Sequence, residues 1–498
     1  MVFNSLQFLI FFPIVLCVYF VIPQKIRYLW LLVASYYFYM CWNVQYALLL
    51  LFSTVVTYIS GILLEKIKHR NLEEKRKLKY KKCCVAGSFV MNLAVLFFFK
   101  YFDFLFDNIN HLLNTVNIEL NHPTFDIILP VGISFYTFQA LSYTMDVYRD
   151  EIYAEKNFFR YALFVSFFPQ LVAGPIERSK NLLRQLAVPT KFNFEKARDG
   201  VLLMIWGYFL KVVLADRIAI FVDTIYGDYE TYGGCYLIIA TLLFAVQIYC
   251  DFGGYSIIAM GAAEILGIHL MENFNAPYLS KSVAEFWRRW HISLSSWFRD
   301  YLYIPLGGNR KGYMRKNVNL LIVFLVSGLW HGADWSFVLW GGINGFYQII
   351  GVLLKPLRDR MVTLLHLNRQ SLGHKLAKVV ITFLFVDFAW IFFRADNYND
   401  AVAIIDSMIN IYNPWILFDE SLFACGLNRD NFSIMLLSIG ILLFADICKY
   451  RGVKIREVIV AQDYWVRWLV ISFSVCAILL FGIWGTGYDA ASFIYFQF

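Results

Sequence analysis

The feature that most restricts the fold of this chain is a series of apolar segments, many of them close to the length of a membrane-spanning helix. A helix needs about 20 mostly apolar residues to cross the roughly 30 Å hydrocarbon core of a bilayer. The segments lie at 3–22, 28–42, 44–64, 83–106, 126–146, 158–175, 201–222, 236–267, 318–330, 335–354, 376–393, 432–447 and 465–484. They do not alternate apolar and polar residues over about ten positions, as the strands of a membrane β-barrel do. The sequence therefore predicts an all-α, multi-pass membrane protein.

The composition supports this class and excludes several others. The chain of 498 residues is 59% hydrophobic and 16% charged, whereas soluble domains average about 45–50% apolar and roughly 25% charged residues. These values exclude a disordered chain, a secreted disulfide scaffold and a soluble nucleic-acid-binding protein. The net charge of +8 is better understood through the positions of the Lys and Arg residues, because these set membrane orientation.

The distribution of charge predicts how the segments cross the membrane. The loop 65–82 is strongly basic, which places it in the cytoplasm and the N-terminus outside. The loop 178–198 is also basic, so the segment 158–175 between two inner loops, with its Pro and Gly residues, is expected to be re-entrant. The acid-rich stretch 394–431 falls outside. Twelve crossings plus one re-entrant segment result, in a single domain 1–498 with both termini outside.

The segment 284–301 has the pattern of a helix that lies in the membrane surface. Its large apolar side chains fall in one sector about 120° wide, namely Phe286, Trp287, Trp290, Leu294, Trp297, Phe298 and Tyr301. We expect one continuous interfacial helix with tryptophans at headgroup level. His291 lies at the edge of the apolar sector and can face the protein interior. The following turn, 305–311, combines glycines with Arg310 and Lys311; a phosphate-binding backbone and an ordinary basic turn both remain open.

His331 lies between the segments 318–330 and 335–354. A helix over 318–330 rises roughly 20 Å, which places His331 beyond the midplane of the bilayer. An ionisable residue there is a candidate for function, with a hydrogen-bonded core histidine as the alternative. A neutral imidazole can act as a general base or form an acyl-imidazole. His291 and His331 have no carboxylate or Cys at ligand spacing, so we expect no metal.

The sequence contains neither a GxSxG motif nor a P-loop, so it indicates neither a serine nucleophile nor a nucleotide hydrolysis site. Asp251 interrupts the apolar segment 236–267 and needs a partner. A structural clamp on a broken helix and a contact with substrate both remain open for it.

Five motifs spread over the chain resemble those of the membrane-bound O-acyltransferase family, in the branch of the alginate O-acetyltransferase membrane subunit. They are Leu129-Pro-Val-Gly-Ile-Ser-Phe-Tyr-Thr-Phe-Gln139, Phe167-Phe-Pro-Gln-Leu-Val-Ala-Gly-Pro175, Trp287-Arg-Arg-Trp-His-Ile-Ser-Leu-Ser295, Arg299-Asp-Tyr-Leu-Tyr-Ile-Pro-Leu-Gly-Gly-Asn309 and Leu329-Trp-His-Gly332. The ending Phe493-Ile-Tyr-Phe-Gln-Phe498 also resembles this branch.

The resemblance implies a ring of helices around a central tunnel in a bacterial cytoplasmic membrane. It implies that His331 is catalytic and that His291 lies in the same tunnel; Asp251, Trp330, Gln139, Asn309 and Arg299 are the candidates for contact with substrate. The implied donor is cytosolic acetyl-CoA. The implied partner is an exported serine-hydrolase-like protein that passes acetyl to an exported or cell-wall polysaccharide.

One departure and two alternatives accompany this resemblance. The branch often reads Asp-Phe-Ser-Gly-Tyr-Ser-Asp where this chain has Asp251-Phe-Gly-Gly-Tyr-Ser-Ile257, which leaves the role of Asp251 and the acceptor open. The alternative within the family is D-alanyl transfer to teichoic acid from a carrier protein. The alternative outside it is a transporter, although the sequence shows neither the paired repeats nor the cluster of charges that a transporter should have.

Overall fold

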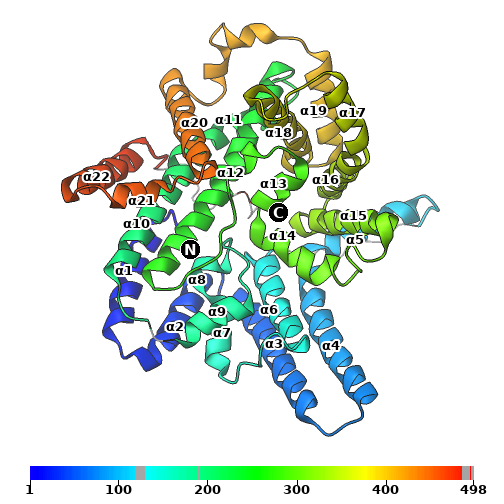
Figure 1. Ribbon diagram of the computed structural model, residues 1–498, viewed down its shortest axis with the longest axis vertical. Coiled ribbons are helices and arrows are strands. Elements are labelled where there is room, and N and C mark those ends of the chain that lie inside the picture. Colours follow the sequence, from blue (N-terminus) through cyan, green and yellow to red (C-terminus); the bar gives the residue numbers. More distant parts are fainter. Residues whose placement is uncertain (119–128, 189, 485–493, 495–498) are drawn as a thin grey trace. The chain divides into compact units, whose positions relative to one another are not determined.

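The computed structural model describes residues 1–118, 129–188, 190–484 and 494, and all regular structure in these ranges is helical (Figure 1). Internal contacts divide the chain into two compact units. Unit 1 comprises Met1–Val201 and Ala259–Met271, and unit 2 comprises Leu202–Ile258 and Glu272–Phe498. Of the motif 493–498, residue 494 alone is described, and residues 126–128, at the start of the predicted segment 126–146, are not among the described residues.

The helices of unit 1 follow the apolar segments closely. They are α1 (Leu6–Val21), η1 (Gln24–Ile26), α2 (Arg27–Met40), α3 (Tyr46–His69), α4 (Glu74–Lys100), α5 (Phe102–Asn114), α6 (Ile133–Tyr148), α7 (Phe158–Ser166), α8 (Phe168–Leu171), α9 (Ser179–Ala187) and residues 194–201 of α10 (Phe194–Tyr208). The helix α6 packs against both α3 and α4, and α2 packs against α7.

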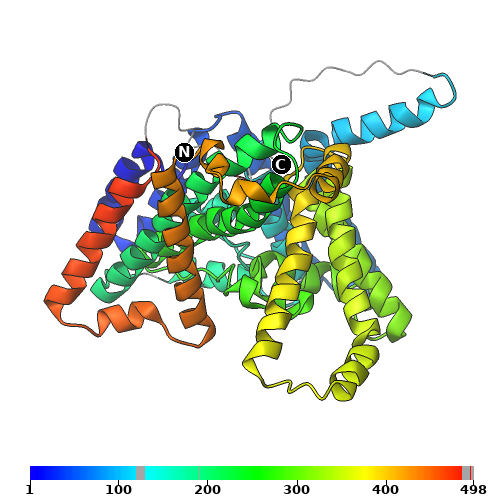
Figure 2. The same cartoon turned by 90° about the horizontal axis from the view of Figure 1, so that it is seen from above.

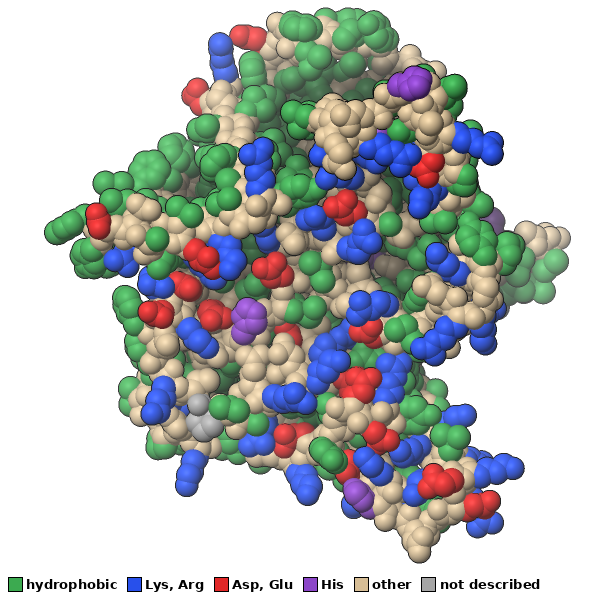
Figure 3. Space-filling model, viewed as in Figure 1, with side chains coloured by type: hydrophobic (Ala, Val, Ile, Leu, Met, Phe, Trp, Pro, Cys, Tyr) green, Lys and Arg blue, Asp and Glu red, His purple; other side chains and the backbone are tan. Residues whose placement is uncertain are grey.

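The helices α3 and α4 form an antiparallel pair that projects from the rest of unit 1 (Figure 1). Their apolar parts are joined by the basic stretch that includes Lys66, Lys68, Lys75 and Arg76. Lys and Arg side chains gather over this end of the pair (Figure 3). The side chain of Asp150, from the loop after α6, lies between two of these lysines, 2.9 Å from Lys68 Nζ and 3.5 Å from Lys81 Nζ. The predicted loop 65–82 is therefore mostly helical: its basic residues lie on the ends of α3 and α4, and residues 70–73 alone form the turn between them.

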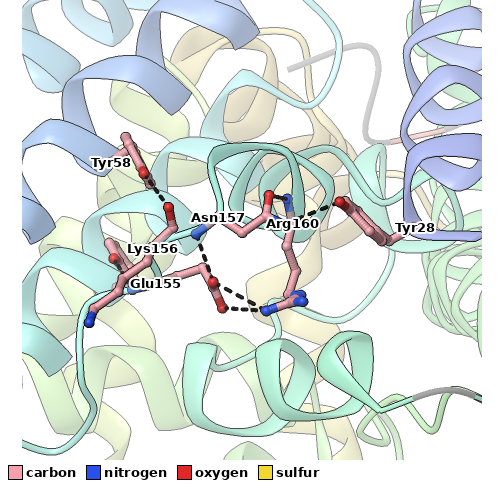
Figure 4. Close-up of polar contacts among 7 residues, drawn as sticks. Tyr28, Tyr58, Glu155, Lys156, Asn157 and Arg160 are labelled. Carbon is pink, nitrogen blue, oxygen red and sulfur yellow. Dashed lines mark hydrogen bonds and ion pairs between the residues drawn. The ribbon is translucent and has the colours of Figure 1, made fainter. Parts of the chain in front are cut away.

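A polar cluster fixes the beginning of α7 against α2 and α3 (Figure 4). The side chain of Asn157 caps α7 by accepting from the Arg160 N–H at 3.2 Å, and it donates to the Tyr28 hydroxyl at 3.2 Å. The Arg160 guanidinium lies 3.3 Å from the Glu155 carboxylate, and the Tyr58 hydroxyl donates to the Lys156 carbonyl at 2.7 Å. Because an uncapped helix start leaves N–H groups unsatisfied, this cluster stabilises the entry of the chain into α7.

The predicted interruption within 158–175 is confirmed. The helix α7 ends at Ser166, Phe167 adopts a non-helical conformation, and α8 begins at Phe168. The Phe168 N–H donates to the Ser35 hydroxyl of α2 at 3.1 Å, and the side chains of Phe167 and Phe168 are fully buried. The irregular backbone thus lies inside protein, as such backbone must at membrane depth.

The helices of unit 2 surround the candidate site. They are η2 (Phe209–Ala215), α11 (Asp216–Gly227), α12 (Cys235–Ile265, whose last residues belong to unit 1), η3 (Pro277–Leu279), α13 (Val283–Arg289), α14 (Ile292–Phe298), η4 (Arg299–Tyr303), α15 (Gly312–His331), α16 (Trp335–Leu353), α17 (Lys355–Leu364), α18 (Leu372–Arg394), α19 (Tyr398–Asn410), η5 (Pro414–Leu417), η6 (Ser421–Ala424), α20 (Arg429–Tyr450), α21 (Ile455–Val460) and α22 (Tyr464–Phe481). Figure 2 shows α15, α16 and α18 side by side, in agreement with their contacts.

Seven helices among the described residues are long and apolar enough to cross a membrane, namely α3, α4, α12, α16, α18, α20 and α22. Their outward faces are apolar. On α22, for example, Trp465, Leu469 and Leu480 are 80%, 69% and 77% exposed. Apolar surface of this extent is not stable in water, so the structure is that of a multi-pass membrane protein.

Candidate active site

His331 is the last residue of α15, at the point where α15 turns into α16. The two helices approach closely because glycines face each other. A Cβ added at Gly328 would lie 2.2 Å from the Phe337 carbonyl oxygen, and one at Gly341 would lie 2.2 Å from the Phe324 carbonyl oxygen. Small residues allow helix backbones to come this close. The position of His331 therefore depends on the tight pairing of α15 and α16.

Aromatic rings surround the His331 imidazole. Its ring centroid lies 4.9 Å from that of Trp330, 5.0 Å from that of Trp340 and 5.3 Å from that of Phe393, and the side chains meet edge to face. Trp340 in turn stacks on Trp390 at 5.7 Å. His331 is 4% exposed. Rings from α15, α16 and α18 thus form an aromatic cage that excludes water from the His331 side chain.

His291 lies beside this cage. Its ring centroid is 6.5 Å from that of His331, 6.0 Å from that of Trp330 and 4.7 Å from that of Phe252. The side chain is fully buried, and burial lowers the pKa of His291 to about 3. Both imidazoles predicted from the sequence are therefore brought together in one apolar region, and His291 is neutral at physiological pH.

The prediction of one continuous helix over 284–301 is wrong. The chain forms α13, breaks at Trp290 and His291, and resumes as α14; His291 has the left-handed values φ 43° and ψ 54°. The apolar sector is also buried in protein rather than exposed: Trp287 and Trp297 are 8% and 6% exposed, and Trp290 is 1% exposed. The Trp287 indole donates to the Asn344 side chain of α16 at 3.1 Å. The tryptophans thus pack the interior around the histidines.

Asp251 has a cationic partner that sequence analysis missed. Its carboxylate lies 2.6 Å from Lys211 Nζ, and the same ammonium lies 2.8 Å from the Asp216 carboxylate. All three side chains are almost fully buried. The second oxygen of Asp251 accepts from the Ile494 N–H at 2.9 Å. The signal in the sequence was a lysine inside the apolar segment 201–222, where an ionisable residue requires a partner.

The other predicted site residues lie in different surroundings. Arg299 belongs to η4, where its exposed side chain pairs with Asp300 at 2.8 Å. Asn309 is exposed and accepts from the Tyr303 hydroxyl. Gln139 belongs to unit 1, where it is buried in α6 and donates to the Phe164 carbonyl at 2.5 Å. Of the five candidates for contact with substrate, Trp330 lies in the aromatic cage with the two histidines.

No group of three or more His, Cys, Asp or Glu residues with metal-binding geometry occurs in the ranges that the structure describes. What the site offers is a pair of imidazoles in an apolar, aromatic enclosure. Such a pair can take a proton from a hydroxyl group or carry an acyl group on nitrogen.

Known proteins are similar in sequence to this chain over most of its length. The pattern of MBOAT, the membrane-bound O-acyltransferase family, matches residues 149–392, which include both histidines. The probable alginate O-acetylase AlgI of Pseudomonas aeruginosa is 38% identical over 454 residues, which cover 89% of this chain and 80% of that protein. The peptidoglycan O-acetyltransferase of Helicobacter pylori is 33% identical, over 77% of this chain and 74% of that protein.

A more distant relative has a related activity. The teichoic acid D-alanyltransferase of Bacillus subtilis is 27% identical over 274 residues, which cover 51% of this chain and 64% of that protein. The matching pattern, the identity to the two O-acetylating relatives and the multi-pass helical structure agree. The chain belongs to the membrane-bound O-acyltransferase family and is an O-acyltransferase.

Proposed function

We propose that the chain transfers an acetyl group from a cytosolic donor across the membrane for O-acetylation of an exported or cell-wall polysaccharide, and that His331 performs the transfer. The observation that carries this proposal is the pair of buried imidazoles 6.5 Å apart inside an aromatic cage, in a chain whose relatives are named alginate O-acetylase and peptidoglycan O-acetyltransferase. A small acyl group suits such an apolar enclosure.

The proposed donor is acetyl-CoA. In the transfer, a hydroxyl oxygen bonds to the acetyl carbon and the carbon–sulfur bond of the thioester breaks. The hydroxyl proton goes to the imidazole of His331 and finally to the leaving thiolate. If His331 instead carries the acetyl group itself, its ring nitrogen first bonds to the acetyl carbon as the carbon–sulfur bond breaks and the thiolate leaves. The hydroxyl oxygen then bonds to the acetyl carbon, the carbon–nitrogen bond breaks, and the hydroxyl proton returns to the imidazole. Both routes start from the unprotonated imidazole, which can attack the acetyl carbon or accept a proton.

His291 would assist within the same enclosure. It lies 6.5 Å from His331, across from the shared Trp330 ring. Because burial keeps it neutral, one of its ring nitrogens can donate a hydrogen bond while the other accepts one. Donation toward the carbonyl oxygen of the acetyl group would stabilise the negative charge that develops there.

The finer arrangement in the membrane also remains a proposal. It comprises twelve crossings, a re-entrant segment over 158–175 and a tunnel within a ring of helices, in a bacterial cytoplasmic membrane with both termini outside. A single engineered cysteine at position 75 or 228, in a cysteine-free chain, tests the orientation with a membrane-impermeant thiol reagent. Labelling of intact cells at 228 but not at 75 fits the proposed orientation, and the reverse result inverts it.

On the outer side of the membrane, an exported serine-hydrolase-like partner would receive the acetyl group. The absence of a GxSxG motif from the sequence motivates this division of labour, since a serine nucleophile for the final transfer would come from the partner. Deletion of that partner should leave the polysaccharide unacetylated, and resupply of the partner should restore ester-linked acetate.

D-alanyl transfer is the second candidate, supported by the 27% identity to the Bacillus subtilis teichoic acid D-alanyltransferase. Membranes that contain the chain can be incubated with radiolabelled acetyl-CoA or with a D-alanyl-charged carrier protein, and label that is released from polymer by mild alkali is then counted. We expect ester-linked label from acetyl-CoA. Label from the charged carrier alone would overturn the acetyl proposal.

A further inference from the structure

The break between α13 and α14 requires an explanation, because the sequence pattern over 284–301 favours one continuous helix. The break places His291, a residue with a Cβ, in the left-handed region at φ 43°. This conformation is unfavourable for residues other than glycine. Contacts from elsewhere in unit 2 must therefore hold it.

Asn273 provides these contacts. The Ile292 N–H donates to the Asn273 backbone carbonyl at 3.0 Å, and the Ser293 N–H donates to the Asn273 side-chain oxygen at 3.3 Å. These are the first N–H groups of α14, which lack partners within the helix. The side chain of His291, the residue at the N-cap of α14, makes no capping hydrogen bond. Asn273 thus caps α14 from a different segment, in place of the His291 side chain.

Asn273 is itself anchored to α12. Its side-chain nitrogen donates to the Ser256 hydroxyl at 3.0 Å, and Asn273 and Ser256 are each 1% exposed. The next residue, Phe274, packs against Trp290 and Phe252, with ring centroids 5.0 Å apart in both cases. The chain around Asn273 therefore connects α12 to both sides of the break.

We infer that Asn273 is a positioning residue that holds His291 beside His331, with Ser256 as its anchor. Without the side chain of Asn273, the Ser293 N–H would be buried without a partner, and that cost would favour relaxation of His291 into the right-handed helical region. The chain would then approach the continuous helix that the sequence pattern favours, and the imidazole would turn away from His331. This inference rests on the proposed function, in which His291 assists the transfer.

Two substitutions separate the hydrogen bonds of Asn273 from its volume. Asn273→Leu has a similar size but neither donor nor acceptor. Asn273→Asp keeps an oxygen in reach of the Ser293 N–H, and the Ser256 hydroxyl can donate to its other oxygen. In membranes supplied with radiolabelled acetyl-CoA, we expect Asn273→Leu to lower turnover about 100-fold, as small misplacements of catalytic groups do, with KM for acetyl-CoA unchanged. Asn273→Asp should recover most of the turnover.

A second pair of variants keeps the test valid if Asn273→Leu does not reach the membrane. Ser256→Ala removes the anchor, and we expect a partial loss of turnover with KM for acetyl-CoA unchanged. Thr241→Val is the matched control on α12, because it removes another buried hydrogen bond, that between the Thr241 and Tyr226 hydroxyls at 2.7 Å. Its turnover per chain should match the unmodified protein.

Each outcome decides a separate question. Equal losses in Asn273→Leu and Asn273→Asp, full turnover in Asn273→Leu, or equal losses in Ser256→Ala and Thr241→Val would overturn the positioning role. If His291→Ala and His331→Ala are inactive while Asn273→Leu is fully active, the positioning role alone fails. If His291→Ala and His331→Ala are both active, the proposed function fails, and the behaviour of the Asn273 variants cannot rescue it.

Discussion

Replacing Lys211 with methionine is the perturbation whose effect the structure specifies most closely. The substitution removes the ammonium group that lies 2.8 Å from the Asp216 carboxylate and 2.6 Å from the Asp251 carboxylate. All three side chains are nearly inaccessible to solvent. Removing one partner of a buried ion pair costs about 3–5 kcal/mol, because a charge is left buried without compensation. Here two carboxylates lose their shared cation, so we expect a cost toward the upper end of that range.

The comparison with Asp251→Asn sharpens the expectation. Asparagine leaves the Lys211–Asp216 pair in place and keeps an oxygen that can accept from the Ile494 N–H. Its cost should therefore be smaller than that of Lys211→Met. The double variant Lys211→Met/Asp251→Asn should be more stable than Lys211→Met alone, since one buried carboxylate instead of two then lacks the lysine cation.

The assay is thermal unfolding of the detergent-solubilised full chain, followed with a dye that becomes fluorescent on reaction with thiols. In a chain whose other eight cysteines are replaced by serine, Cys250 is the one thiol; it lies next to Asp251 and is fully buried, so its reaction reports the opening of this region. Lys211→Met should unfold at a clearly lower temperature, followed by Asp251→Asn and then the unmodified chain. A Lys211→Met chain as stable as the unmodified one would refute the structural clamp. Loss of transfer in Asp251→Asn without loss of stability would instead assign Asp251 to substrate.

Two further predictions concern the histidines and the helix pair that carries them. Burial lowers the pKa of His291 from 6.5 to about 3, so below pH 6.5 the unfolded chain binds a proton that the folded chain does not. Stability should therefore fall by about 2 kcal/mol between pH 6.5 and 5, and a pH series of unfolding midpoints should show a weaker decline in His291→Gln. Gly328→Ala should lower both stability and transfer, because its Cβ would lie 2.2 Å from the Phe337 carbonyl oxygen. Gly351→Ala is the control: it has open space around it and should change neither. Equal effects of the two substitutions would contradict the close packing of α15 and α16.

The sequence predicted the helices better than it predicted their contacts. The apolar segments reveal α3, α12 and α18 because hydrophobic length is a property of consecutive residues. The interruption at Phe167 was also predictable, since Pro169 and Gly174 lie within a few positions of it. By contrast, the break at His291 was missed. Asn273 holds it through hydrogen bonds that join residues 19 and 20 positions apart, and no local pattern contains that information.

The candidate site, too, was predictable only in part from the sequence. His331, Trp330 and His291 could be proposed from motifs, and the structure brings them together. The partner of Asp251 could not be proposed from a motif, because Lys211 is separated from it by 40 positions and lies on a π-helical turn. The burial of Trp287 and Trp290 was also missed: an amphipathic pattern shows that one face is apolar, but membrane lipid and protein interior both satisfy such a face.

The central claim is that His331 carries out the acyl transfer, and its substitution by alanine tests that claim most directly. Membranes with equal amounts of the unmodified chain and of His331→Ala are supplied with radiolabelled acetyl-CoA, and label released from polymer by mild alkali is measured. We predict a fall of about 10²- to 10⁴-fold, the usual contribution of a general acid–base residue. His269→Ala, which alters an exposed histidine paired with Glu264, should transfer label at the unmodified rate. Unchanged transfer in His331→Ala would contradict the account.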